Sequence, residues 1–159
     1  MNKIDTKFLV KTAMIAAIYA VCTVAIAPLS FGAIQFRFSE ILVLLAFLDK
    51  DYIPGLVLGC AIANLFSPLG LIDVFVGSFA TFLSVYMISK SKSLFVASLW
   101  PTLNCVFVGA ELYFITKMPF ILTTLQVALG EFVVVTLIGF PVFKVLMNNE
   151  RLTNLLKLK

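Results

Sequence analysis

The sequence predicts an all-helical, polytopic membrane protein built as a bundle of six transmembrane helices, and three observations support this fold class. Of the 159 residues, 62% are hydrophobic and 13% are charged, with 16 phenylalanines and no histidine. A water-soluble domain of this size carries a larger share of charged residues. The apolar residues form long runs, near the roughly 20 residues that a helix needs to cross a bilayer. Because only short polar stretches separate these runs, we expect one domain over residues 1–159.

The breaks between the apolar runs consist of prolines, glycines, serines and charged residues, which favour turns and end helices. They fall at residues 28–39, 49–52, 67–70, 89–93 and 116–119. The predicted helices between them cover roughly residues 8–27, 40–48, 53–66, 71–88, 94–115 and 120–147.

The first helix follows a polar start that includes Lys3 and Lys7, and no small-residue cleavage pattern comes after it. It is therefore predicted to be retained and not removed as a signal peptide. Its alanines form two overlapping AxxxA pairs, a spacing that lets helices approach closely. The four alanines face either another helix of this chain or a partner protein: Ala13, Ala16, Ala17 and Ala20.

The second predicted helix is too short to cross a bilayer, because its nine residues cover about 14 Å. Part of the preceding loop must then lie within membrane depth. Irregular backbone at that depth has to be buried in protein or to line a cavity. The segment 31–40 is therefore a candidate part of a binding site.

The third and fourth helices contain small and polar residues for which packing or capping is one interpretation. Gly55 and Gly59 form a GxxxG pair that favours close internal packing. Asn64 is either a cap at the end of the third helix or part of a pocket lining. Asp73 lies at the start of the fourth helix, where an acid complements the positive end of the helix dipole. Like Glu40 at the start of the second helix, it is also a candidate for function.

The basic residues predict the orientation, because lysine and arginine concentrate in short cytoplasmic loops. With six helices and a cytoplasmic N-terminus, only Arg37 and Lys117 fall outside. The other basic residues fall inside: Lys3, Lys7, Lys11, Lys50, Lys90, Lys92, Lys144, Arg151, Lys157 and Lys159. We therefore expect both termini in the cytoplasm and segment 31–40 on the outer side of the cell membrane. The same bias explains the net charge of +4 without any nucleic-acid partner.

Two acids lie inside predicted spans, where an ionisable group is costly and is therefore a candidate for function. On the fifth helix, Trp100, Asn104 and Glu111 recur at helical spacing together with Phe107 or Val108, so they form one stripe. Another stripe follows the sixth helix, while Gln126 projects from a different side; this second stripe contains Thr124, Ala128 and Glu131. We expect the two faces to converge beneath the outer loop.

These stripes predict the chemical class of a ligand. Carboxylates accept hydrogen bonds from amine and amidine edges, amides pair with lactam edges, and an aromatic face stacks on a flat ring. A planar, nitrogen-rich small molecule, cationic in some forms, fits these groups best. The chain has neither a GxxxxGK[ST] phosphate loop nor a histidine for a metal site or a catalytic triad. It is therefore predicted to bind a solute without being an enzyme, and without a metal or a cofactor.

Three segments carry a resemblance to a known family. They are FGAIQFRFSE over residues 31–40, IPGLVLGCAIAN over 53–64 and GLIDVFVGS over 70–78. With them, nearly the whole chain resembles the QueT family, whose members are substrate-binding (S) subunits of energy-coupling factor (ECF) transporters. The resemblance implies a first outer loop that closes over the ligand. It also implies a coupling subunit that meets the alanine face and two ATPase subunits that supply the energy.

The resemblance further implies uptake of a vitamin-like queuosine precursor, a 7-deazaguanine such as preQ1, preQ0 or queuine. Either Glu111 or Glu131 would take the guanine edge, with Glu40 or the other acid on an amine. Arg37 either contacts the solute or holds the loop shut against an acid. The full set of expected substrate contacts is Gln35, Arg37, Glu40, Asn64, Trp100, Asn104, Glu111, Gln126 and Glu131.

A second interpretation is a small exporter of cationic compounds driven by the proton gradient. In that case Glu111 or Glu131 would alternate between a proton and the substrate, and dimerisation would replace the partner ATPase. The polar outer loop counts against this interpretation, since such an exporter needs no cap. A membrane-embedded enzyme would need a nucleophile with its base, or a set of metal ligands, and the chain offers neither.

Overall fold

Over residues 6–157, which the computed structural model describes, the chain forms helices joined by short turns, as predicted. Four helical stretches are long and apolar enough to cross a membrane. They are α1 (Thr6–Ala25), α5 (Leu71–Lys90), α6 (Leu94–Thr116) and a continuous rod made of α7 (Phe120–Glu131), the π-helical segment η3 (Phe132–Gly139) and α8 (Phe140–Met147). Lys3 and Lys159, which helped to orient the chain, lie outside the described residues, as does the side chain of Lys7.

The other two predicted helices are present near their expected bounds but are shorter than a bilayer requires. The second comprises a 3-10 helix, η1 (Phe38–Leu44), followed by α3 (Leu45–Leu48). The third is α4 (Ile53–Asn64), which has 12 residues and a proline in its first turn. The prediction of six spans is thus not confirmed by length alone, although each predicted helical region exists.

Three short helices were not predicted. They are α2 (Ala27–Ser30), η2 (Lys50–Tyr52) and α9 (Glu150–Leu156). The Asn149 side chain caps α9 by accepting hydrogen bonds from the backbone N–H groups of Arg151 and Leu152, at 3.1 and 3.3 Å. The Tyr52 hydroxyl donates to the Leu156 carbonyl at 2.5 Å and so holds α9 against η2.

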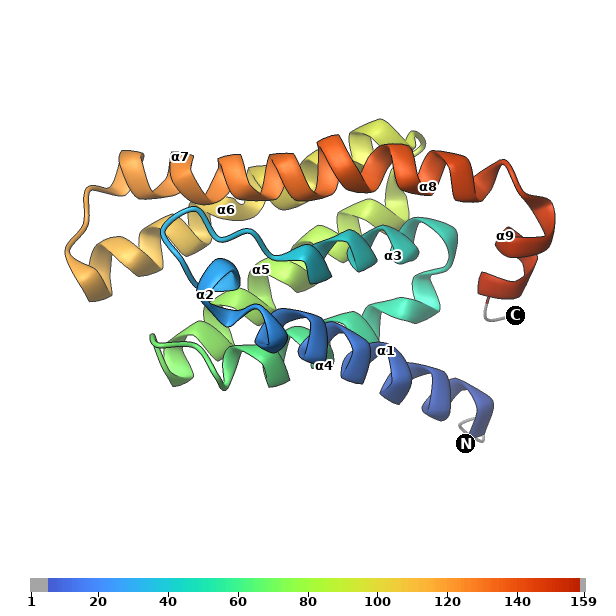
Figure 1. The fold of residues 1–159 in the computed structure, drawn as a ribbon, viewed down its shortest axis with the longest axis horizontal. Helices are drawn as coiled ribbons and strands as arrows, with labels where there is room; N and C mark the ends of the chain where they lie inside the picture. Colours follow the sequence, from blue (N-terminus) through green and yellow to red (C-terminus); the bar gives the residue numbers. More distant parts are fainter. Residues whose placement is uncertain (1–5, 158–159) are drawn as a thin grey trace.

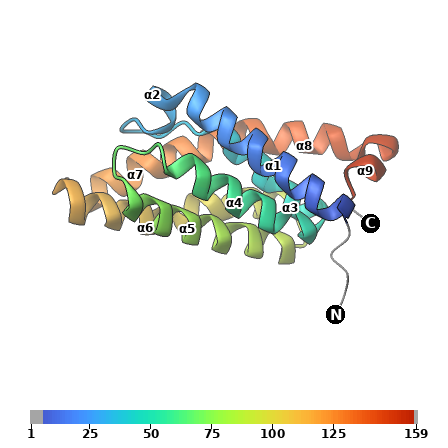
Figure 2. The ribbon, with the colours of Figure 1, turned by 90° about the horizontal axis from the view of Figure 1, so that it is seen from below.

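Helices that follow one another in the sequence pack side by side: α4 on α5, α5 on α6, and α6 on α7. Helix α1 packs on α4, so α1 and the α7–η3–α8 rod lie on opposite sides of the bundle (Figures 1 and 2). Between them run η1 and α3, which contact α1, α5 and η3. Helix α9 lies at the same end of the bundle as the first residues of α1, while the α6–α7 connection lies at the opposite end (Figure 1).

Helices α1 and α4 approach closely at a glycine. A Cβ atom on Gly59 would lie 2.8 Å from the Cβ atom of Tyr19 and 3.0 Å from the Cα atom of Ala16. The GxxxG pair of α4 therefore serves internal packing, as predicted. The alanines of α1 divide between two faces: Ala16 and Ala20 are buried, whereas two others are exposed, Ala13 and Ala17.

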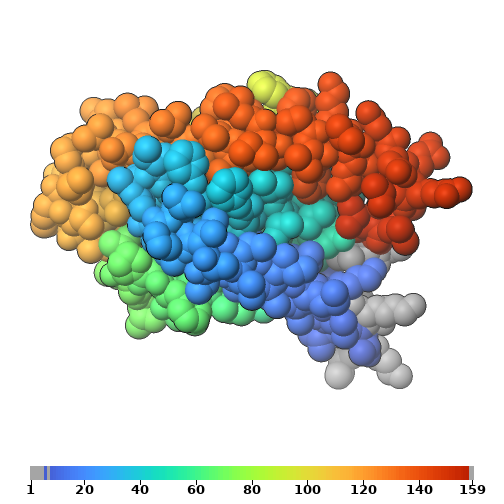
Figure 3. Space-filling model, viewed as in Figure 1, coloured from blue at the N-terminus to red at the C-terminus, as the bar shows by residue number. Residues whose placement is uncertain are grey.

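The apolar core lies toward the end of the bundle that carries α9. Leu44, Leu56, Val85, Ile88 and Val135 are fully buried in one cluster there. Most of the buried charged side chains lie elsewhere, around the segment between α2 and η1. This segment, residues 31–37, is called the cap loop below. In the space-filling view, the cap loop and η1 fill the face between α1 and the α7 rod (Figure 3).

Candidate functional site

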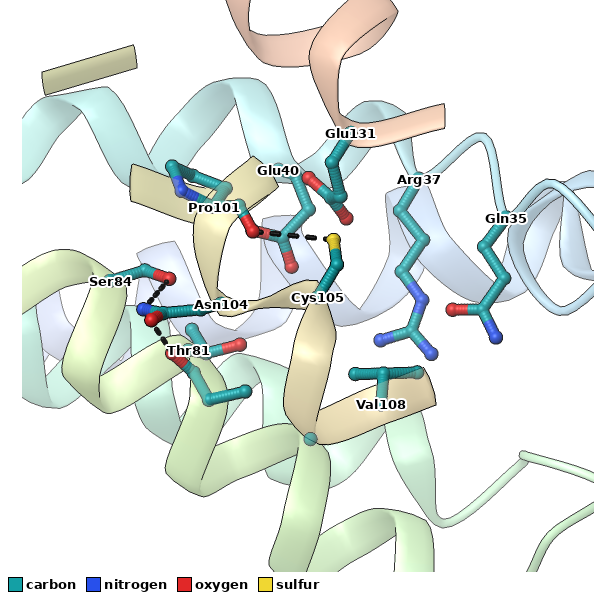
Figure 4. Close-up of a pocket in the computed structure, with 12 residues that line it drawn as sticks. Gln35, Arg37, Glu40, Thr81, Ser84, Pro101, Asn104, Cys105, Val108 and Glu131 are labelled. Atoms are coloured by element: carbon teal, nitrogen blue, oxygen red, sulfur yellow. Dashed lines mark hydrogen bonds between the residues drawn. The ribbon is translucent and has the colours of Figure 1, made fainter. Parts of the chain in front are cut away.

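A narrow polar cavity lies beneath the cap loop, between η1, α5, α6 and α7. Its cavity volume is only about 30 Å³, so in this conformation the space is nearly closed. Five of the predicted contacts line it: Gln35, Arg37, Glu40, Asn104 and Glu131 (Figure 4). We call this space the inner cavity. Its remaining lining residues are Gly77, Ala80, Thr81, Ser84, Pro101, Cys105 and Val108.

Two carboxylates from different elements face the inner cavity. Glu40 is the third residue of η1, and Glu131 is the last residue of α7. Both are less than a tenth exposed and near enough to interact electrostatically. The Glu40 carboxylate accepts a hydrogen bond from the Tyr19 hydroxyl of α1, whereas one oxygen of Glu131 has no hydrogen-bond partner among the described residues. Glu131 therefore has the capacity to accept a hydrogen bond from a ligand.

Asn104 on α6 supplies an oriented amide. Its side-chain nitrogen donates to the Ser84 hydroxyl at 2.8 Å and lies 3.4 Å from the Ala80 carbonyl, both on α5. These bonds occupy the NH₂ group and leave the amide oxygen as the group that can accept from a ligand. The inner cavity thus combines two carboxylates with a fixed amide.

Arg37 connects the cap loop to three helices. Its guanidinium donates to the Ser30 carbonyl of α2 at 3.2 Å and to the Asn64 amide oxygen of α4 at 3.3 Å. Its Nη2 atom lies 3.7 Å from the Asp73 carboxylate at the start of α5. Burial lowers the pKa of Arg37, but the charges around it, first that of Asp73 and then those of Cys60, Tyr19 and Glu40, together outweigh burial and raise that pKa above its ordinary value. Of the two roles left open for Arg37, the geometry favours holding the loop against an acid.

A chain of hydroxyl groups joins the same region to α1. The Thr23 and Ser39 hydroxyls are 2.6 Å apart, and the Ser30 hydroxyl donates to the Thr23 carbonyl at 2.9 Å. All three residues are buried. Together with the bond from Tyr19 to Glu40, this chain fixes α2 and the start of η1 on α1.

Four predicted contacts lie outside the inner cavity. Asn64 lies beside it and binds Arg37, and its NH₂ group donates to the Asp73 carbonyl at 3.0 Å. It is therefore a pocket support and not only a helix cap. The Trp100 indole donates to the Ser91 hydroxyl at 3.0 Å, away from the cap loop.

Gln126 lines a separate and wider space on the other side of the cap loop. This outer vestibule has a cavity volume of about 460 Å³. It lies among the cap loop, the α4–α5 turn, the end of α6 and the start of α7. Gln35 lines both the outer vestibule and the inner cavity.

Glu111 lies on α6 beside a groove between α5 and α6 that is otherwise apolar, with Phe75, Phe79 and Phe114 among its lining residues. The Glu111 carboxylate is buried, and neither oxygen has a hydrogen-bond partner among the described residues. The structure therefore separates Glu111 from Glu131, which had been predicted to converge.

Sequence reasoning missed several residues of this site. Thr81 and Ser84 lie on the same face of α5 as Gly77 and line the inner cavity. A search for charged groups overlooks them, because both are small and uncharged. Tyr19, whose hydroxyl donates to the Glu40 carboxylate, lies among the alanines of α1, and the sequence pattern there indicated only helix packing. Within residues 6–157, no group of three or more acidic, cysteine or histidine side chains could hold a metal ion.

The arrangement is suited to binding rather than to bond breaking. It offers carboxylate and amide acceptors in a small space, while hydrogen bonds to neighbouring helices fix several of the side chains. A ligand with several N–H donors on a flat ring would match these acceptors.

Comparison with known proteins gives a consistent result. Residues 9–148 match the family model described as QueT transporter. The chain is 34% identical over 149 residues to the queuosine precursor transporter QueT of Lactococcus lactis subsp. cremoris (strain MG1363). That match covers 83% of this chain and 88% of the relative. No solved structure matches the chain.

Proposed function

Since this chain belongs to the QueT transporter family, we propose that it captures a queuosine precursor and serves as the S subunit of an ECF-type importer. The ligand is a 7-deazaguanine: preQ1, preQ0 or queuine. The family is one of transporters, so the chain binds and delivers its ligand without altering it. Coupling and ATPase subunits supply the energy for uptake.

The observation that carries this proposal is the inner cavity. Glu40, Glu131 and the Asn104 amide oxygen come together in a bundle whose other residues are mostly apolar. The exocyclic amine and ring N–H of a 7-deazaguanine donate to a carboxylate, and its lactam oxygen accepts from an amide donor such as Gln35. We assign Glu131 to the guanine edge, because one of its oxygens is unpartnered.

The charges around the inner cavity favour a cationic precursor. Arg37 also lines the inner cavity, and its guanidinium lies 3.7 Å from the Asp73 carboxylate. Three buried carboxylates, those of Glu40, Glu131 and Asp73, thus surround one buried cation, which leaves room for a second cation. An aminomethyl group, as in preQ1, would supply that cation, whereas the nitrile of preQ0 would not. We therefore expect preQ1 to bind more tightly than preQ0.

We further propose six crossings of the cell membrane with both termini in the cytoplasm. The short η1–α3 and α4 segments would complete the set, because the cap loop and the α4–α5 turn fill the outer part of the bundle. The location of α9 and the beginning of α1 at the same end supports this orientation (Figure 1). So do the basic residues, of which Lys11, Lys90 and Lys144 fall on the cytoplasmic side.

The proposed contact with a coupling subunit lies on α1. Ala13 and Ala17 are exposed and form one of the AxxxA pairs, a spacing that allows close approach of another helix in the bilayer. Ala16 and Ala20 pack internally in this conformation, so they would support the surface from behind. Enlarging Ala13 and Ala17 to leucine should leave ligand binding intact and prevent transport.

Direct identification of the bound molecule tests the substrate. The chain, purified from cells in mild detergent, is denatured and the released small molecules are examined by mass spectrometry. Recovery of a 7-deazaguanine supports the proposal, whereas repeated recovery of an unrelated compound would refute the substrate.

Reconstitution tests the transport class. Co-purification with an ATPase complex, and uptake in liposomes only when that complex and ATP are present, are the expected results. Transport that follows a proton gradient with this chain alone would instead favour the small exporter.

A further inference from the structure

The cap loop rests directly on a glycine of α7. At Gly130 an added Cβ atom would collide with the backbone carbonyl oxygen of Ile34 and would lie 2.8 Å from that of Gln35. Both obstacles are backbone atoms, so no change of a side-chain rotamer can relieve the collision. The loop can occupy its present place only because residue 130 has no side chain.

The part of the loop that lies against Gly130 also contains a residue with a positive φ angle. Gln35 has a φ angle of +51°, in the left-handed region that residues with a Cβ atom rarely adopt. The Gln35 N–H donates to the Gly32 carbonyl at 3.2 Å, and the Arg37 N–H donates to the Gln35 carbonyl at 3.0 Å. Contacts on both sides therefore hold a backbone conformation that is unfavourable for glutamine.

The turn occupies the boundary between two spaces. Gln35 lines the inner cavity and the outer vestibule alike. Gly130 directly precedes Glu131, which lines the inner cavity. A loop lifted from Gly130 would open the inner cavity to the vestibule, and a loop seated on Gly130 separates them.

From these contacts we propose that Gly130 is the seat of the cap loop and a positioning residue that controls the exchange of ligand between the vestibule and the inner cavity. This inference rests on the proposed function for the ligand, but the seating itself does not depend on which ligand is bound. Gly130 contacts the loop at Ile34 and Gln35, whereas the Arg37–Asp73 pair holds the end of the loop next to η1. Both contacts therefore keep the cap loop closed.

Limited proteolysis of the ligand-free protein in detergent tests the seating. Trypsin cleaves after Arg37 only when the buried loop opens, whereas Lys117 lies exposed in the α6–α7 connection and serves as an internal reference. With Gly130→Ala, cleavage after Arg37 relative to cleavage after Lys117 should rise about tenfold or more. The fragments are identified by mass spectrometry.

Gly139→Ala is the matched control. It adds the same methyl group to the same rod, where the nearest atoms would be the Leu44 side chain at 3.2 Å and the Val134 carbonyl oxygen at 3.3 Å, so only a shift of a few tenths of an ångström is needed. Its cleavage after Arg37 should stay within about twofold of the wild type. If Gly130→Ala gives the same cleavage ratio as Gly139→Ala, Gly130 is not the seat and the inference is wrong.

A second variant covers the case in which Gly130→Ala fails to fold. Gln35→Gly introduces no collision and removes the cost of a left-handed backbone. Cleavage after Arg37 should then slow by about threefold, and faster cleavage would overturn the claim that the turn is held in an unfavourable conformation.

Ligand kinetics connect the seat to function. For a bound 7-deazaguanine, Gly130→Ala should raise the dissociation rate at least tenfold with little loss in the association rate. A merely destabilised fold would lower the bound fraction without changing this rate. Absence of binding by the wild type would refute the proposed function, while the proteolysis result would still decide the seating.

Discussion

The two ends of this bundle are built from different residues, although the same helices run through both. Near α9, side chains such as Leu56, Ile88 and Val135 form a fully buried apolar cluster. Near the cap loop, the buried side chains include Arg37 and Asp73, joined to each other and to several helices. The apolar end stabilises the fold. The polar end holds hydrogen-bond acceptors such as Glu131, one oxygen of which has no partner among the described residues.

The contrast explains why the acids are tolerated. A buried carboxylate is costly in an apolar environment, so each one that lacks a partner weakens the fold. The apolar end and the close α1–α4 contact at Gly59 offset that cost. A bundle that carried polar groups evenly along its length would lack this division.

The largest expected effect is at the apolar end. Leu56→Ala removes a fully buried side chain and should lower the free energy of unfolding by about 2 to 5 kcal/mol. Unfolding in a denaturing detergent measures this change. Leu58→Ala on the exposed side of α4 is the control and should cost far less. Equal losses for the two variants would contradict the division between the ends.

At the polar end, Glu131→Gln should weaken ligand binding by about 1.5 to 3 kcal/mol, because a charge-assisted hydrogen bond is lost. Its stability should stay unchanged or rise, since a buried charge has been removed. Calorimetric titration and thermal unfolding of the same sample measure both quantities. A drop in stability with unaltered affinity would mean that Glu131 is structural.

A smaller effect is expected at the pair that holds the cap loop. Asp73→Asn leaves Arg37 with its bonds to Ser30 and Asn64 but without its acidic neighbour. Ligand dissociation should accelerate about five- to tenfold, near 1 kcal/mol of affinity, measured by stopped-flow displacement. Asp51→Asn, at the other end of the bundle, is the control. Unchanged dissociation in Asp73→Asn would assign Asp73 to the helix dipole alone.

The smallest effect is predicted for Glu111→Gln. Glu111 lines the groove between α5 and α6 and not the inner cavity. Its replacement should change ligand affinity by less than about twofold in the same titration. A loss as large as that of Glu131→Gln would show that the two acids act together after all.

The sequence was a good guide to the helical regions and to the loop that covers the site. Apolar runs and polar breaks located all six predicted regions, and the short second helix correctly placed segment 31–40 against the interior. The π-helical stretch in the last rod was not anticipated. Its i→i−5 bonds, such as Phe140 N–H to Val135 carbonyl, depend on packing that no local pattern specifies.

The candidate site was predicted less completely, for a geometric reason. A stripe at helical spacing runs along a whole helix, but a cavity occupies only part of its length. Asn104 falls within the cavity, whereas Trp100 and Glu111 on the same stripe lie on either side of it. Likewise, the acid that faces Arg37 could not be chosen from sequence, because it depends on how α5 packs beside the cap loop.

The most direct test is a calorimetric titration of preQ1 into the purified chain in lipid nanodiscs. The wild type should bind one molecule saturably, and the Glu40→Gln/Glu131→Gln double variant should bind at least about a hundredfold more weakly, because both charged acceptors are lost. Failure of the wild type to bind would contradict the account. So would a double variant that is folded and binds within about threefold of the wild type.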